Sequence, residues 1–256
     1  MSSAPMTEIP IMPERTLKLF KAAVIAGLKD LPAYKLLGTK YSEIMLKLGF
    51  GCGLAGTTVE GYKSWIRSVS RGIAGRPAIV VLEPDGLAQL GCLSEADRAT
   101  RLALLRDAVA VLKASPGIRV YLDAGHSSWI SAGEMSSRLI HGGIKQADGF
   151  SLNISNFRTT ESNIRYGTQI SQATGGNHFV IDTSRNGLGP AADAQWCNPA
   201  GRALGERPTV MTKNALVDAL LWIKYPGESD GACNGGPAAG QWWADYALGL
   251  DQRAAF

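Results

Sequence analysis

Short apolar runs alternate with longer amphipathic segments from residue 58 onward, and this alternation limits the possible folds more than any other feature of the sequence. Such an order is typical of βα units, in which parallel strands are buried on both faces. The runs predicted to be strands cover residues 78–82, 118–122, 149–154, 178–181 and 220–224. We therefore predict an α/β fold around a parallel sheet.

Helices are predicted between these strands. Ser94 is followed three residues later by Asp97, a capping pattern, and apolar residues then recur at helical spacing. The candidate helices cover residues 59–74, 94–114, 135–146, 161–174 and 213–219. Residues 1–50 do not show this alternation of apolar runs and amphipathic segments, and the stretch "ERTLKLFKAAVIAGLKD" predicts a helix there. We expect a mostly helical N-terminal segment (1–50) before a main domain (51–256).

The charge pattern argues against two classes of partner. The net charge is only +4, and Lys and Arg are interspersed with Asp and Glu, so no nucleic-acid footprint is visible. No stretch of about 18 apolar residues is present, so we expect no membrane span. The N-terminus carries acids and prolines where a secretion signal needs an apolar run.

Polar residues follow every predicted strand. Their C-terminal continuations are Glu83-Pro84-Asp85, Asp123-Ala124-Gly125-His126, Asn153-x-x-Asn156, residues 182–186 ("DTSRN") and Lys224-x-x-x-Glu228-x-Asp230. In a (β/α) barrel the carboxyl ends of the strands share one rim, and that rim carries the active site. We therefore predict a barrel whose strand tips bring these side chains to one cleft.

Each strand tip also has a simpler interpretation. Asp85 taken alone is more often an acid that caps the next helix, but five polar tips in succession favour a shared rim. Asp123 and His126 could bind a metal ion, yet the sequence contains no H-x-H or H-E-x-x-H pair. Acid/base chemistry by carboxyl groups, without a cofactor, fits the sequence better.

Two tryptophans and a glycine-rich loop suggest a sugar ligand. Trp129 and Trp196 lie in polar loops, where an indole can offer a flat apolar face to a sugar ring. "PGESDGACNGG" surrounds Glu228 and Asp230 with glycines, which allow close approach of the backbone to a ligand. A solvated surface loop is the simpler alternative. Trp242 and Trp243 are interpreted as packing residues.

Together these stretches resemble glycoside hydrolase family 6, a cellulase family of endoglucanases and cellobiohydrolases, and the bacterial members most closely. The matching segments, in family order over about residues 52–245, are "VVLEPDGLAQ", "VYLDAGHSSW", "GFSLNISNF", "FVIDTSRNGLGP", "WCNPAGRALGERPT" and "KYPGESDG". The resemblance implies a distorted (β/α) barrel, here incomplete on its N-terminal side. It also implies an extracellular, monomeric enzyme that cleaves internal β-1,4-glucan bonds with inversion.

The resemblance assigns roles to individual residues. Asp85 is the expected general acid, Asp230 is the base or holds the network that activates water, and Asp123 maintains charge and geometry near the cleavage point. The residues expected to bind sugar are His126, Trp129, Asn156, Trp196, Lys224 and Glu228.

The four cysteines include no C-x-x-C pair, and their number alone allows three disulfide connectivities. The resemblance implies the pairs Cys52–Cys92 and Cys197–Cys233.

The sequence departs from the family pattern at one site position. Phe50-Gly51 stands where the family has Arg-Asp, so the carboxylate expected to raise the pKa of the acid is missing. This difference motivates an alternative, a catalytically impaired glucan-binding relative. Residues 1–50 also lack the family's opening strands, which suggests a truncated or rearranged N-terminus.

Overall fold

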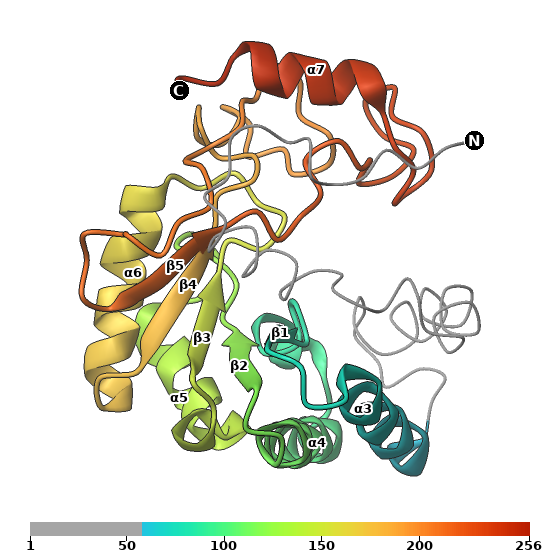
Figure 1. Ribbon diagram of the computed structural model, residues 1–256, viewed down its shortest axis with the longest axis vertical. Coiled ribbons are helices and arrows are strands. Elements are labelled where there is room, and N and C mark those ends of the chain that lie inside the picture. Colours follow the sequence, from blue (N-terminus) through green and yellow to red (C-terminus); the bar gives the residue numbers. More distant parts are fainter. Residues whose placement is uncertain (1–57) are drawn as a thin grey trace.

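In the computed structural model, which describes residues 58–256, five parallel strands form one sheet in the order β1-β2-β3-β4-β5. The strands are β1 (Ala78–Leu82), β2 (Ile118–Asp123), β3 (Gly149–Leu152), β4 (His178–Asp182) and β5 (Val217–Leu221). The sheet curls into about half of a barrel (Figure 1). The prediction of a distorted, incomplete (β/α) barrel is therefore confirmed.

Helices alternate with the first four strands along the chain, one before each strand, and lie along one side of the sheet (Figure 1). They are α3 (Val59–Ile73), α4 (Glu95–Lys113), α5 (Ala132–Gly142) and α6 (Thr160–Thr174), with short 3-10 turns η2 (Ala88–Cys92) and η3 (Ile144–Gln146). The predicted cap of α4 is confirmed, because Ser94 Oγ accepts a hydrogen bond from the Asp97 N–H at 3.2 Å. Helix α7 (Ala244–Gln252) lies on the side toward which the strands end.

The core fills both faces of the sheet. The face toward the helices carries most of the buried apolar residues, including Phe150 and Phe179, whose rings stack at 5.1 Å. Gly167 of α6 lies directly over Phe179, since a Cβ there would come within 2.5 Å of the ring. The other face buries a smaller group that includes Tyr121 and Val180. Burial on both faces explains why the strands are continuous apolar runs in the sequence.

Two predicted helices are corrected, and one helix was missed. The candidate helix at 213–219 is wrong, because these residues lead from a turn into β5, which pairs with β4. Short apolar runs fit either period, and here pairing with the sheet decides the outcome. The predicted 135–146 helix is α5 followed by η3, and α7 was not predicted. The helix predicted within residues 1–50 lies outside the described residues.

Within residues 58–256, no helix is both long enough and apolar enough to cross a bilayer.

Candidate active site

The loop that carries Asp85 is held in an unusual backbone conformation. Glu83 and Asp85 have φ values of +51° and +67°, in the left-handed region that costs about 1–3 kcal/mol for residues with a side chain. Such a conformation persists only where its surroundings fix it. Behind the loop, the hydroxyl of Tyr62 donates a 2.9 Å hydrogen bond to Glu83, and Arg101 donates to the carbonyl of Gly86 at 3.3 Å. Helices α3 and α4 thus brace the tip of β1.

Asp85 and Asp123 are brought together at this tip. The backbone N–H of Asp85 donates to Asp123 Oδ2 at 2.9 Å. Burial raises the pKa of Asp85 to about 6. Burial and the adjacent charge of Asp85 raise the pKa of Asp123 to about 7, although hydrogen bonds to Asp123 act in the opposite direction. The two carboxyl groups can therefore retain a proton at a pH at which an ordinary aspartate is ionised.

His126 and Trp129 lie in the loop after β2. Burial and the charge of Arg158 lower the pKa of His126 to about 4, so its imidazole is neutral at neutral pH. Its Nδ1 accepts a 3.3 Å hydrogen bond from the Ser128 N–H, which leaves Nε2 as the protonated nitrogen. The Trp129 ring is 5.5 Å from the imidazole, and 41% of the residue is exposed. This loop presents one hydrogen-bond donor beside one apolar face.

A buried carboxylate ties the tips of β3, β4 and β5 together. Asp182, at the end of β4, accepts hydrogen bonds from the backbone N–H groups of Ser155, Ser184, Ile223 and Lys224 at 2.9–3.3 Å. Because these donors come from three different strand tips, Asp182 fixes the tips relative to one another. The site residues on β3 and β5 are therefore built on one rigid edge.

Asp230 is held by two cations and a backbone amide. Arg185 Nη1 lies 2.8 Å and Lys224 Nζ 3.5 Å from its carboxylate, and the N–H of Asn198 donates to it at 3.0 Å. The side-chain oxygen of Asn198 in turn accepts from the Asp230 N–H at 2.8 Å. Burial lowers the pKa of Lys224, while the charges of Asp230 and, to a smaller extent, Glu228 act in the opposite direction. Charged residues from two strand tips thus meet around Asp230.

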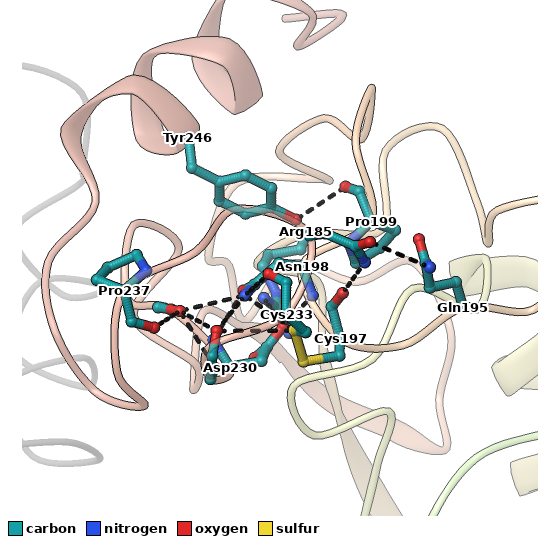
Figure 2. Close-up of a disulfide and its surroundings, with 12 residues drawn as sticks. Arg185, Gln195, Cys197, Asn198, Pro199, Asp230, Cys233, Pro237 and Tyr246 are labelled. Carbon is teal, nitrogen blue, oxygen red and sulfur yellow. Dashed lines mark hydrogen bonds and ion pairs between the residues drawn. A yellow bond between two sulfur atoms is a disulfide. The ribbon is translucent and has the colours of Figure 1, made fainter.

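The predicted disulfide Cys197–Cys233 lies beside this group (Figure 2). It joins the loops that carry Asn198 and Asp230 across 36 residues of sequence. Cross-links of this kind typically contribute about 2–4 kcal/mol to stability. The Asn198 amide donates to the carbonyls of Gly231 (2.8 Å) and Cys233 (3.1 Å), which further fixes the loop. Cys52 and Gly51 lie outside the described residues, and with them the predicted Cys52–Cys92 bond.

The remaining predicted residues are found on the same edge of the sheet. Trp196 precedes the disulfide and is 63% exposed, and Glu228 follows β5. Asn156 follows β3, where its side-chain oxygen accepts a hydrogen bond from the Phe157 N–H at 2.8 Å. The sugar-binding roles of these residues stay predictions. Asp85 and Asp123 occupy the β1–β2 side of the edge, and Asp230 the β4–β5 side.

Several residues of the site were not singled out from the sequence. In the sequence, Arg185, Asn198 and Asp182 appear only as members of polar strand tips or loops. Glu83 appears there only as a neighbour of Asp85. Their roles depend on contacts with partners 21 to 45 positions away in the sequence. The only available signal was an Arg and two acids within predicted strand tips, which is common on protein surfaces.

A curled parallel sheet with acidic side chains at its carboxyl edge defines this protein as a (β/α)-barrel protein with a candidate active site at that edge. A comparison with sequence families narrows this class. The model of "Glycosyl hydrolases family 6" matches residues 51–254, and the chain belongs to that family.

Individual relatives agree with the family. Endoglucanase A of Cellulomonas fimi is 51% identical over 210 residues, which are 80% of this chain and 45% of that protein. Endoglucanase 1 of Streptomyces halstedii is 43% identical over 194 residues, 73% of this chain and 59% of that protein. The chain therefore spans about half the length of these relatives.

A solved structure shares the fold. The endoglucanase Cel6 from Mycobacterium tuberculosis, in complex with methyl-cellobiosyl-4-deoxy-4-thio-β-D-cellobioside, superposes with a TM-score of 0.74 at 51% identity, over 77% of this chain and 69% of that one. None of these three relatives is described as a non-hydrolytic protein, so the comparisons give the impaired alternative no support. Within residues 58–256, no group of three or more His, Cys, Asp or Glu side chains is placed to hold a metal ion, so the structure gives the metal alternative no support.

Proposed function

We propose that this chain is an extracellular, monomeric endo-β-1,4-glucanase whose catalytic domain comprises residues 51–256. It hydrolyses internal bonds of cellulose or related β-glucans with inversion at the anomeric carbon. The observation that carries the proposal is the raised pKa of Asp85 in its braced loop beside Asp123. The names of the endoglucanase relatives support the same substrate class.

Asp85 supplies the proton in the proposed mechanism. A glycosidic oxygen becomes a leaving group when a carboxylic acid protonates it, and the acid must still hold its proton near neutral pH. Burial provides this condition for Asp85, with Asp123 beside it. Because Asp123 also accepts from the backbone N–H of Asp85, it orients the loop that delivers the proton.

Asp230 orients the attacking water and accepts the proton that this water loses as its bond to the anomeric carbon forms. A carboxylate offers about four lone-pair sites, and three donors already occupy its oxygens. The remaining capacity suits a water molecule that attacks the anomeric carbon from the face opposite to Asp85. Inversion requires the two carboxyl groups to be about 6.5–9.5 Å apart, and their positions on opposite sides of the sheet edge fit this separation better than neighbouring residues would.

Sugar rings bind on both sides of the cleavage point. Trp129 and Trp196 offer exposed apolar faces, while His126 and Lys224 donate hydrogen bonds. Asn156 and Glu228 complete the proposed set on the tips of β3 and β5.

The pH dependence tests the assignment of the acid. Asp85 works only when protonated, so we expect kcat/KM on carboxymethyl-cellulose to fall about tenfold per pH unit above a midpoint near pH 6. The pH midpoint reflects the coupled titration of Asp85 and Asp123, so an Asp123→Asn variant should shift it. The measurement is reducing-end release between pH 4 and 9. A rate that rises steadily through pH 8 would contradict a protonated Asp85.

A further inference from the structure

The loop that carries Glu228 pairs with the segment before α7. Glu228 and Trp242 form an antiparallel bridge. The N–H of Ser229 donates to the carbonyl of Gln241 at 2.9 Å, and the N–H of Trp243 donates to the carbonyl of Gly227 at 2.8 Å. These bonds flank the bridge, so Glu228 and Trp242 form a non-hydrogen-bonded pair.

Side chains of such a pair project from the same face, with their Cβ atoms about 4.5–5.5 Å apart. Glu228 acts electrostatically on Lys224, and Lys224 lies 3.5 Å from Asp230. Trp242 therefore pairs with the loop that carries Asp230, which lies two residues beyond Glu228.

The indole of Trp242 is supported on one side and open on the other. A Cβ on Gly227 would come within 2.2 Å of indole Cζ3 and 2.4 Å of Cη2, so the ring lies directly against a position that only glycine can occupy. Tyr225 packs against the ring edge-to-face at 6.3 Å. Even so, Trp242 is 59% exposed. Its neighbour Trp243 stacks on Tyr246 at 5.2 Å and serves packing instead.

We propose that Trp242 is a further glucan-binding residue, whose open indole face stacks on a glucose ring of a chain that passes Glu228 and the Lys224–Asp230 pair. The proposal rests on the proposed function. A ring held in place before the ligand arrives loses little conformational entropy on binding, which is the condition under which one aromatic contact improves affinity. The earlier interpretation of both tryptophans as packing residues therefore holds for Trp243 and not for Trp242.

The test is the dissociation constant of cellohexaose, measured by calorimetry in an Asp85→Asn background so that the sugar is not cleaved. Trp242→Ala should raise Kd about 3- to 10-fold, in line with one lost ring contact. Because the indole packs on Gly227, two further variants separate stacking from folding. Trp242→Phe keeps a ring and should retain most of the affinity, while Trp242→Leu keeps apolar volume only and should bind as weakly as Trp242→Ala.

Leu248→Ala is the matched control, since Leu248 is a similarly exposed apolar residue on α7. It should leave Kd unchanged. If the Asp85→Asn protein binds cellohexaose, and Trp242→Leu and Trp242→Ala in that background bind it as tightly as Asp85→Asn alone, the inference about Trp242 is wrong while the proposed function stands. If the Asp85→Asn protein and the wild type both fail to bind any cello-oligosaccharide, the proposed function falls together with the inference.

Discussion

Asp85→Asn is expected to lower kcat on carboxymethyl-cellulose by about 10²–10⁴-fold, the range that a general acid contributes. The amide has nearly the shape of the carboxyl group but cannot donate a proton to the glycosidic oxygen. Asn also keeps the backbone N–H that donates to Asp123, so the loop should remain in place. Reducing-end release measures the loss.

An activated substrate provides the control for this variant. A 2,4-dinitrophenyl cellobioside carries a leaving group that departs without protonation, so Asp85→Asn should lose far less activity on it. Equal losses on both substrates would indicate a structural role for Asp85, and unchanged activity on the polymer would place the acid elsewhere.

The same variant should be more stable than the wild type at alkaline pH. The pKa of Asp85 is raised in the folded state, so its contribution to stability is present below about pH 4 and is lost as the pH rises through about 6. Asn does not titrate. The unfolding free energy of Asp85→Asn should therefore exceed that of the wild type by about 3 kcal/mol at pH 8 and by little at pH 4. Urea unfolding at both pH values measures the difference.

Arg185→Met is expected to destabilise the protein by about 3–5 kcal/mol, because it leaves a buried carboxylate without its main partner. Arg185 is completely buried, its guanidinium pairs with Asp230 at 2.8 Å, and it lies 4.5 Å from the centre of the Phe157 ring. It also donates to the carbonyl of Ser155. Methionine keeps an apolar contact with Phe157 but loses the ion pair with Asp230 and the hydrogen bond to Ser155. The change is measured by urea unfolding at pH 7.

Two variants check the cause of this loss. Arg165→Met removes an exposed arginine that pairs with Glu161 one helical turn away, and it should cost less than about 0.5 kcal/mol. The double variant Arg185→Met/Asp230→Asn removes the orphaned charge and should be more stable than Arg185→Met alone. If the free-energy changes of the two single variants simply add in the double variant, packing, and not the charge of Asp230, explains the role of Arg185.

The strands and the carboxyl edge could be predicted from the sequence because both depend on local pattern. A buried parallel strand must be an apolar run, and the residue types after it are visible directly, as at Asp85 and Asp123. The segment 213–219 failed because its apolar residues fit a helix or a strand, and only pairing with β4 decides between them. Helix α7 had no clear periodic signal.

The contacts that organise the site could not be predicted in the same way. Asp182 collects backbone donors from three strand tips, and Arg185 reaches Asp230 across 45 positions of sequence. These partners meet only after the sheet has formed. The two adjacent tryptophans show the same limit, since the sequence treats them alike, while in the structure Trp242 pairs with Glu228 and stays exposed and Trp243 stacks on Tyr246 of α7.

The anomeric form of the first product tests the central claim most directly. Cellotetraose is incubated with the protein, and proton NMR follows the new reducing end before mutarotation equilibrates it. Direct attack by a water held at Asp230, with protonation by Asp85, converts a β-linkage into an α-product, so the α-anomer should appear first. Initial release of the β-anomer would contradict the account, because it requires a covalent intermediate and a different arrangement of the two carboxyl groups.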